Sequence, residues 1–410
     1  MKAATRLSGG ATDHDPLLAA ARDARFVLLG EATHGTHEFY RERGRLSERL
    51  VRELGFGAVA IEGDWSNTYR VNRYVRGIGT DRSAEQALSG YRKFPQWMWR
   101  NAEFRDFVER LRAWNMQQPA ERRVGVYGMD VYDIFDAADA VVAYLRRVDP
   151  EAASRVQRHY RCFNGFQNRN EAYGEAARQR SCQKAATAAE AEMRRIPRPR
   201  GTLEAEEHFG ALRAAASVVG GEEYFREAYA GSNAWNLRDE RMAQNVTAIA
   251  EHVGALAGRT GKVAVWAHNS HVGDARATGA VNRGELNLGQ LMRQRHGAAA
   301  FLTGFFTYDG RVMAATEWGA PGRVFDIRPS LPGSYGDVFH SSGLPAFSLL
   351  LRGRKDLGRM IGEPRQQRAI GVIYAPATER ASHYFEAIIS DQFDAILFYD
   401  RTSPVTPLRG

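Results

Sequence analysis

The chain has 410 residues, of which 44% are hydrophobic and 25% are charged, and its formal net charge is +8. No apolar run approaches the roughly 18 residues that cross a bilayer, so the composition is typical of a globular protein and excludes a membrane-spanning one. The positive charge comes mainly from arginines that alternate with acidic residues, as in RDFVERLRAW, which does not favour nucleic-acid binding.

The N-terminal segment and the two cysteines indicate a reducing compartment. The first 25 residues lack the apolar core of a secretory signal, so we expect a cytoplasmic protein. Cys162 and Cys182 are the only cysteines, and they lack the spacing of a CxxC motif or a metal site. We therefore expect neither a disulfide nor a catalytic thiol.

Short apolar runs bounded by turn residues predict buried strands, because strands that are buried on both faces read as continuous rather than alternating apolar segments. These runs cover residues 26–31, 58–64, 123–130, 262–271, 298–305, 369–375 and 393–400. Segments with helical periodicity lie between the first runs, at residues 37–54 and 101–115. The alternation predicts an α/β fold with a largely parallel central sheet flanked by helices.

Residues 134–256 show no strand pattern and are charged and helical in period, with interruptions at residues 197–201 and at Gly220 and Gly221. We interpret this region as an inserted helical subdomain or cap. Residues 1–133 and 257–410 would then form the α/β catalytic core. Residues 318–345 are poorly patterned and are expected to be rich in loops.

Polar side chains follow four of the predicted strands at their carboxyl ends, which is the edge where open α/β sheets bind ligands. They are Glu31, His34, Glu62, Asp64, Asp130, His268 and His271. A single acidic residue after a strand is often only a helix cap, and this alternative stays open for Asp130. Several carboxylates and imidazoles at one edge would shift one another's pKa values, which favours acid and base catalysis.

Two pairs of histidines repeat one arrangement, since in each pair the histidines lie three residues apart just after a strand. GEATHGTHEFY contains His34 and His37, and Gly30 and Gly35 allow tight turns there. One histidine of this pair is expected to face the site while the other caps or packs. WAHNSHVGD contains the second pair, for which a purely structural role remains the alternative.

Standard catalytic signatures are missing, because the sequence contains no GxSxG, HExxH, P-loop or GxGxxG motif. Activated water is then a better nucleophile than a serine. A histidine beside a carboxylate can take a proton from water near neutral pH, and a further donor must stabilise the resulting oxyanion.

The motifs GEATHGTHEFY, IEGDW, YGMDVY, WNLRDERM and VWAHNSHVGD occur in the order found in the erythromycin esterase family, which the chain resembles over residues 26–402. Less characterised members of this family are often labelled succinoglycan biosynthesis proteins. The resemblance implies hydrolysis of an ester or lactone by water, in a cleft beneath a helical region.

By position, the resemblance assigns the general base to His34, with Glu31 or Glu62 orienting it, and assigns oxyanion stabilisation to three further residues. These are His268, His271 and Arg43.

A second group of residues is predicted to contact the substrate: His37, Asp64, Asp130, Trp235 and Arg238. The last two belong to WNLRDERM, which either lines the cleft or joins the helical region to the sheet. His383 also falls in the family pattern, but its chemistry does not distinguish a site role from a core role.

Three other functions remain open. A metal-dependent hydrolase would use the same imidazoles and carboxylates. A haem-binding protein would use histidines in a pocket with Trp65, Trp235 and Trp266. An esterase of acylated sugars would share the predicted site. We expect a small-molecule ester or lactone substrate, no cofactor, no metal, and no nucleic-acid or membrane partner, and we do not assume macrolide resistance. The sequence does not predict the oligomeric state.

Overall fold

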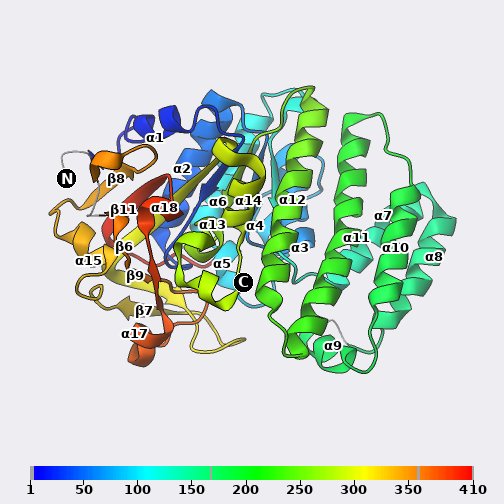
Figure 1. Ribbon diagram of the computed structural model, residues 1–410. Coiled ribbons are helices and arrows are strands. Elements are labelled where there is room, and N and C mark those ends of the chain that lie inside the picture. The colour runs from blue at the N-terminus through cyan, green and yellow to red at the C-terminus, as the bar shows by residue number, and fades with distance from the viewer. Residues whose placement is uncertain (1–3, 167–168, 358–360, 409–410) are drawn as a thin grey trace. The chain divides into compact units, whose positions relative to one another are not determined.

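The computed structural model describes residues 4–166, 169–357 and 361–408 (Figure 1). The chain forms two compact units: unit 1 comprises residues 1–59, 81–111 and 262–410, and unit 2 comprises residues 60–80 and 112–261. The domain division given above stays a prediction. The bounds of the units differ from it, because residues 60–80 and 112–133 group with the helical region.

Unit 1 is built on a mixed sheet whose strands run in the order β1-β8-β11-β6-β2-β5. Their bounds are β1 Thr5–Arg6, β8 Ala346–Leu350, β11 Ala395–Thr402, β6 Ala300–Ala314, β2 Phe26–Leu29 and β5 Val263–Trp266. The pairs β2 with β5, β2 with β6, and β6 with β11 are parallel. Strand β8 is antiparallel to β11 and to β1. The prediction of a largely parallel sheet is confirmed.

The register of the central strands places the site motifs at one edge. Leu29 of β2 pairs with Trp266 of β5 on one side and with Thr303 of β6 on the other. All residues of β2 and β5 are buried, which explains why both read as continuous apolar runs. The residues that follow Leu29 and Trp266 therefore leave neighbouring strands in the same direction.

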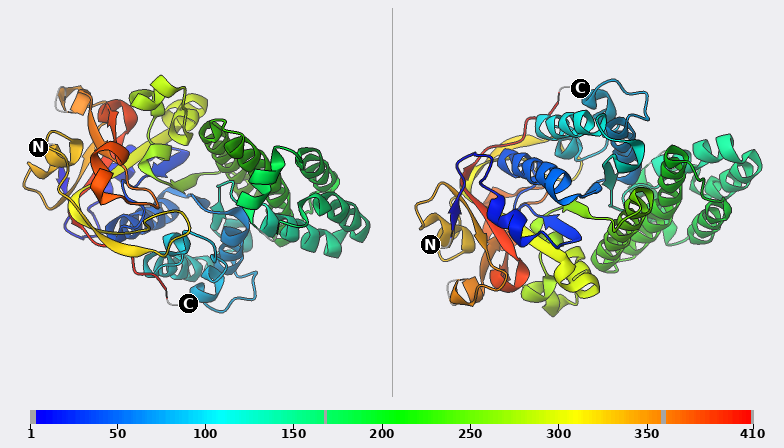
Figure 2. Two further views of the ribbon diagram at one scale, coloured as in Figure 1. Left: turned by 90° about the horizontal axis from the view of Figure 1, so that it is seen from below. Right: turned by 90° about the horizontal axis from the view of Figure 1, so that it is seen from above.

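Helix α2 (His37–Leu54) packs along this sheet, against β5 and β11, as Figure 2 shows for the blue helix beside the strands. Its apolar side chains, including Phe39, Leu46 and Leu50, recur at helical spacing and are buried. The helix ends at Gly55, whose φ of 71° is left-handed and favours glycine. The prediction of a helix over residues 37–54 is confirmed.

Other helices of unit 1 complete the layers around the sheet. They are α1 Asp15–Ala20, α4 Ala84–Leu88, α5 Gln96–Trp99, α6 Ala102–Asn115, α13 Asn269–Val272, α14 Leu288–His296, α15 Tyr335–His340, α17 Glu379–Ser382 and α18 Ile389–Gln392. The last residues of α6 belong to unit 2.

Two segments of unit 1 differ from the sequence predictions. Residues 369–375 are not a strand: β9 (Arg365–Arg368) precedes them and pairs with β10 (Tyr384–Ala387), while Ile370 and Ile373 form only isolated bridges. The apolar run is explained instead by the packing of Ile370 in a core cluster. Residues 318–345 contain α15 and also β7 (Arg323–Ile327), which pairs with β6 and was missed because it carries few buried side chains.

Unit 2 contains the end of β3 (Ala58–Ile61), its neighbour β4 (Gly125–Gly128), helix α3 (Trp65–Arg76) and a set of helices that pack on one another (Figure 1). These helices are α7 Phe135–Val148, α8 Pro150–Tyr160, α9 Asn170–Ala177, α10 Gln183–Arg195, α11 Thr202–Tyr229 and α12 Ala234–Ala257. The break predicted at residues 197–201 falls between α10 and α11.

The predicted interruption at Gly220 and Gly221 is wrong, because α11 runs through both glycines. A Cβ on Gly221 would lie 2.8 Å from Val131 O and 2.7 Å from Ile134 Cγ1. The glycine therefore serves close packing within unit 2 rather than a turn.

The expectation of unpaired cysteines is also wrong. Cys162 and Cys182 form a disulfide across a sequence separation of 20 residues, with their Cα atoms 5.7 Å apart. Their polar, helix-like surroundings gave no sign of this pairing, because the contact joins segments on either side of α9.

In the described part of the chain, no helix has both the length and the apolar character that crossing a membrane requires.

Candidate active site

Glu31 and His34 form a buried hydrogen-bonded pair just after β2. The carboxylate is wholly buried and the imidazole is 6% exposed, and Nδ1 of His34 lies 2.9 Å from Oε1 of Glu31. A carboxylate only accepts hydrogen bonds, so we assign the proton to Nδ1. Nε2 then carries the lone pair, and it has no hydrogen-bond partner among the described residues.

Arg43 of α2 supplies the counter-charge to Glu31. Its Nη2 lies 2.9 Å from Oε2 of Glu31, and both side chains are wholly buried. The separation is that of an ion pair, while the direction of the N–H bonds does not meet hydrogen-bond geometry. Glu31 therefore connects a fixed cation on one side with His34 on the other.

Two glycines allow the backbone of this motif to pass close to its neighbours. A Cβ on Gly30 would overlap Oδ1 of Asn269, and one on Gly35 would overlap the carbonyl oxygen of Met313. Asn269 in turn bonds the backbone of Phe305 in β6 through both its amide nitrogen and its oxygen. The GEATHG turn thus depends on glycine at both positions.

Residues 369–375, which were wrongly predicted as a strand, form backbone hydrogen bonds with the GEATHG turn. His34 N donates to the carbonyl oxygen of Ile370 at 3.1 Å, and Ile370 N donates to that of Ala32 at 2.8 Å. Ile370 is wholly buried. The backbone of His34 is therefore fixed independently of its side chain.

His268 lies against His34, with ring centroids 4.9 Å apart. Its Nε2 lies 3.2 Å from the carbonyl oxygen of Ala32, and its Nδ1 lies 3.2 Å from the backbone N of Ser270. A carbonyl oxygen only accepts and a backbone N–H only donates, so Nε2 carries the proton of a neutral imidazole. These bonds are the ones expected if His268 is structural, and its predicted catalytic role stays a prediction.

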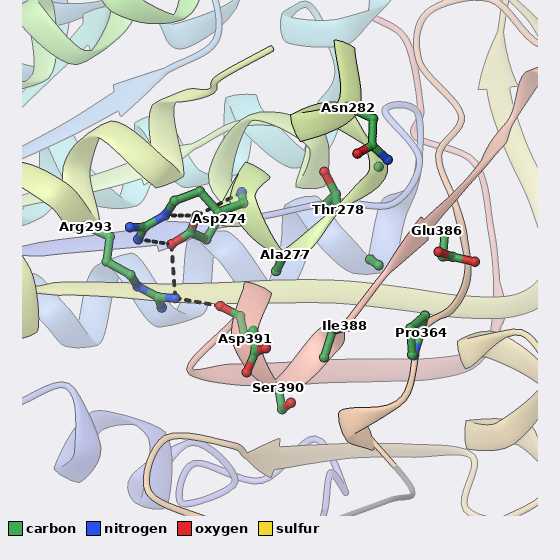
Figure 3. Close-up of a pocket in the computed structure, with 13 residues that line it drawn as sticks. Asp274, Ala277, Thr278, Asn282, Arg293, Pro364, Glu386, Ile388, Ser390 and Asp391 are labelled. Carbon is green, nitrogen blue, oxygen red and sulfur yellow. Dashed lines mark hydrogen bonds and ion pairs between the residues drawn. The ribbon is translucent and has the colours of Figure 1, made fainter. Parts of the chain in front are cut away.

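His271 lies on α13 and is 2% exposed. Unit 1 contains a cavity of about 640 Å³, shown in Figure 3, whose lining includes Asp274, Thr278 and Arg293. Asp274 lies three residues after His271 in the sequence. Asp274 and Arg293 are 3.6 Å apart as an ion pair. None of the predicted site residues, all of which lie in the described part of the chain, lines this cavity.

His37 binds a different partner from His34. Its Nδ1 lies 2.7 Å from Oε1 of Glu103, and its side chain is 35% exposed. This hydrogen bond outweighs burial and raises the pKa of His37. Burial alone would raise the pKa of Glu103, but the bonds from His37 and from the backbone of Thr406 lower it. The two histidines of the motif therefore have different hydrogen-bond partners, and their roles stay a prediction.

In unit 2, Arg238 joins two of the predicted carboxylates. Its Nε lies 2.8 Å from Oδ1 of Asp130 and its Nη2 2.6 Å from Oδ2, while Nη2 is also 2.8 Å from Oε1 of Glu62. The guanidinium lies over the ring of Tyr132, 5.0 Å from its centroid. Burial alone would lower the pKa of Arg238, but Asp130 outweighs burial and holds it well above its ordinary value.

The remaining predicted residues of unit 2 lie at helix starts. Asp64 is the N-cap residue of α3, with no side-chain cap bond. Trp235 is half-buried at the start of α12, where its backbone N donates to Asn233. Asp130 does not cap a helix, since α7 begins after Ile134, so the capping alternative for Asp130 is wrong.

Several side chains that hold these groups were not predicted in that role. Tyr40 and Trp266 contact the Arg43 guanidinium, and Glu103 binds His37. Tyr40 lies one turn before Arg43 on the same helix, which is a usable signal. The pairing with Glu103 joins positions 66 residues apart and leaves no local signal. Among the described residues, no group of three or more His, Cys, Asp or Glu side chains is arranged to hold a metal ion.

Comparison with solved structures shows the same fold in three proteins. A succinoglycan biosynthesis protein matches with a TM-score of 0.78 and 21% identity, covering 99% of this chain and 96% of that one. A protein from Bacillus cereus matches with a TM-score of 0.80 and 20% identity, covering 100% and 97%. A mutant of the erythromycin esterase EreC in its open conformation matches with a TM-score of 0.68 and 16% identity, covering 95% and 94%.

Sequence comparison gives the family. A curated erythromycin esterase type II from Escherichia coli is 28% identical over 119 residues, which are 29% of this chain and only 26% of that relative. The family model described as Erythromycin esterase matches residues 51–402, most of the chain. The family predicted from the motifs is confirmed over residues 51–402, a range that begins after the first motif, GEATHGTHEFY, and the chain is a member of the erythromycin esterase family.

Proposed function

We propose that this protein hydrolyses a carboxylic ester or lactone, with His34 as the general base that activates water. The observation that carries the proposal is the Arg43–Glu31–His34 series, in which Glu31 accepts from Nδ1 at 2.9 Å and leaves Nε2 as the basic nitrogen. This is the arrangement in which a carboxylate sets the tautomer of a catalytic histidine. Membership in the family supports the reaction class.

The proposed reaction has two steps. Nε2 of His34 takes a proton from a water molecule while the water oxygen bonds to the carbonyl carbon, giving a tetrahedral oxyanion. The oxyanion then collapses and the bond to the leaving oxygen breaks, while the imidazolium returns its proton to that oxygen. The products are a carboxylic acid and an alcohol, or one hydroxy acid from a lactone. Glu31 stabilises the intermediate imidazolium, as the acidic residue of a catalytic triad does.

Three other predicted catalytic residues lie in unit 1. Arg43 is wholly buried, so in this proposal it acts through Glu31 and does not touch the oxyanion. His268 and His271 are proposed to stabilise the oxyanion. For His268 this requires release of its Nε2–H bond to Ala32.

Glu62, Trp235 and Arg238 of unit 2 enter the proposal through the family resemblance. Asp64 and Asp130 enter it through their places after predicted strands. Glu62 is proposed as a second essential carboxylate, and Asp64, Asp130, Trp235 and Arg238 as residues that bind substrate. His37 of unit 1 is proposed as a further substrate contact, for which its 35% side-chain exposure is suitable.

The test is hydrolysis of a panel of macrolide lactones, simple lactones and acylated sugars, because the names of the relatives point to the first and the last of these classes. His34→Gln should lower kcat by about 100- to 10,000-fold. His340→Ala is the matched control, since His340 is 45% exposed and pairs with Asp400 at the surface. Equal activity of wild type and His34→Gln would remove His34 from the mechanism, and loss of wild-type activity on chelation would favour a metal-dependent hydrolase.

The location and partners remain proposals too. We propose a small-molecule ester or lactone as the ligand, with no nucleic-acid partner. A cytoplasmic location was predicted, but the disulfide Cys162–Cys182 is typical of oxidising compartments and argues against it. Measuring free thiols in protein from cell fractions, with and without reductant, would decide between a cytoplasmic location and an oxidising compartment.

A further inference from the structure

We propose that Trp266 is a positioning residue that, together with Tyr40, holds the Arg43 guanidinium between aromatic rings and so fixes Glu31 against His34. The kinetic part of this inference rests on the proposed function, whereas the positioning itself can be measured without a substrate.

The bonding of Arg43 is unusual for a buried arginine. A guanidinium has five N–H donors, and a buried donor without a partner is strongly destabilising. Arg43 is wholly buried, and its Nε and Nη1 have no hydrogen-bond partner among the described residues. Its one ion pair within 4 Å in that part of the chain is with Glu31, at 2.9 Å. Directional hydrogen bonds therefore do not explain how this side chain keeps its place.

Two aromatic rings supply the missing interaction. The Cζ of Arg43 lies 4.4 Å from the ring centroid of Tyr40 and 5.1 Å from that of Trp266. Both distances are within the range of cation–π attraction, which is strongest for tryptophan and increases when the pair is removed from water. Trp266 is wholly buried and Tyr40 is 1% exposed, so this condition is met.

The indole of Trp266, which belongs to β5, is hydrogen-bonded to α2, the helix that carries Arg43. Its Nε1 donates to Oγ of Ser47 at 2.8 Å, and Ser47 lies one turn after Arg43 on α2. Phe107 also packs on the indole, with centroids 4.8 Å apart. Trp266 is thus held in place by α2 and by its own strand. Phe107 contacts the indole in the same core and therefore serves as a control position.

Removal of the indole has a defined consequence. The guanidinium would lose one of its two aromatic contacts, become free to shift, and no longer hold Oε2 of Glu31. Oε1 would then no longer fix the proton of His34 on Nδ1, and Nε2 would lose its role as base. Trp266→Leu should lower kcat by about 30-fold with KM nearly unchanged, while Trp266→Phe, which keeps a weaker ring, should lower it by about 5-fold.

The direct measurement is the tautomer of His34, from imidazole ¹⁵N shifts in histidine-labelled protein, with His34→Gln to assign the signals. We expect the Nδ1–H tautomer in wild type and in Phe107→Leu, and a shift towards Nε2–H in Trp266→Leu. Phe107→Leu truncates the same aromatic core without removing the ring over Arg43. If Trp266→Leu and Phe107→Leu gave the same tautomer and the same kcat, Trp266 would be a packing residue only and the inference would be overturned.

A second background keeps the test decisive. In Arg43→Gln protein, the additional change Trp266→Leu should leave the His34 tautomer unchanged, because its effect passes through Arg43. A further change in that background would contradict the inference. If Trp266→Leu does not fold, Trp266→Phe and Tyr40→Leu carry the same comparison. Failure of wild type to hydrolyse any ester would refute the proposed function alone, since the tautomer still reports on Trp266.

Discussion

Replacement of Glu206 by glutamine should destabilise the protein by about 3 kcal/mol at neutral pH, because this carboxylate is the anion of a buried polar cluster in unit 2. Glu206 is 1% exposed. It accepts hydrogen bonds from Asn72 at 2.7 Å, from Tyr127 at 3.0 Å and from His252 at 2.8 Å. The guanidinium of Arg76, 3% exposed, lies 3.4 Å away.

The magnitude follows from the pKa of Glu206. Burial alone would raise it, but the Arg76 guanidinium and the bond from His252 outweigh burial and lower it from 4.5 to about 2. At 1.36 kcal/mol per pKa unit this fall corresponds to about 3 kcal/mol. A lowered folded-state pKa stabilises above the unfolded value, so the contribution is complete above about pH 5 and is lost as pH falls towards 2.

The assay is urea unfolding of wild type and Glu206→Gln between pH 7 and pH 3, followed by far-UV circular dichroism. By pH 3 the difference in unfolding free energy should have fallen by about half or more. Glu207→Gln is the matched control, because Glu207 pairs with Arg147, whose side chain is 53% exposed, and should change stability by less than about 1 kcal/mol. A Glu206→Gln protein as stable as wild type at pH 7, or a difference that does not change with pH, would refute the reasoning.

Two further predictions concern the predicted substrate-binding residues. Arg238→Gln should lower the unfolding free energy by about 3–5 kcal/mol, because it leaves Asp130 buried at 3% exposure without its cation, and urea titration checks this. Arg238→Lys should be less destabilising, since it keeps the charge but loses the two-point contact. His37 has a raised pKa, so its pairing with Glu103 should stabilise fully below about pH 6.5 and weaken as pH rises through the folded value. The difference in melting temperature between wild type and His37→Phe should therefore be larger at pH 6 than at pH 8, and an equal difference would contradict this assignment.

The central strands and α2 could be predicted because their patterns reflect burial directly. Strands β2 and β5 are buried on both faces, and α2 ends at a left-handed Gly55. The prediction failed where burial had another cause. Ile370 is wholly buried by a core cluster rather than by a sheet, so an apolar run without regular pairing was read as a strand. Strand β7 was missed for the opposite reason: it pairs regularly with β6, but this pairing buries few of its side chains.

The site could be predicted only as far as residue types and positions at strand ends allow. Glu31 and His34 follow one strand and meet as a hydrogen-bonded pair, so a local motif was sufficient. The partner of Arg238 was not local, because Asp130 lies 108 residues away. The Cys162–Cys182 disulfide was rejected on spacing, although two cysteines on separate helical segments can meet wherever the helices pack.

The burial of Arg43 is the feature of the site that is hardest to predict from the sequence. On the sequence of α2 it is one arginine among several, and the others, such as Arg41 and Arg45, have side chains 38% and 44% exposed. What separates Arg43 is its helix face, which turns it towards Glu31 and Trp266. A cation without its usual hydrogen bonds must be stabilised by charge and by aromatic faces, and both lie within 5.1 Å of it. In the proposed mechanism the tautomer of His34 therefore depends on side chains that never contact the substrate, so Trp266→Leu should lower kcat, although by less than His34→Gln does.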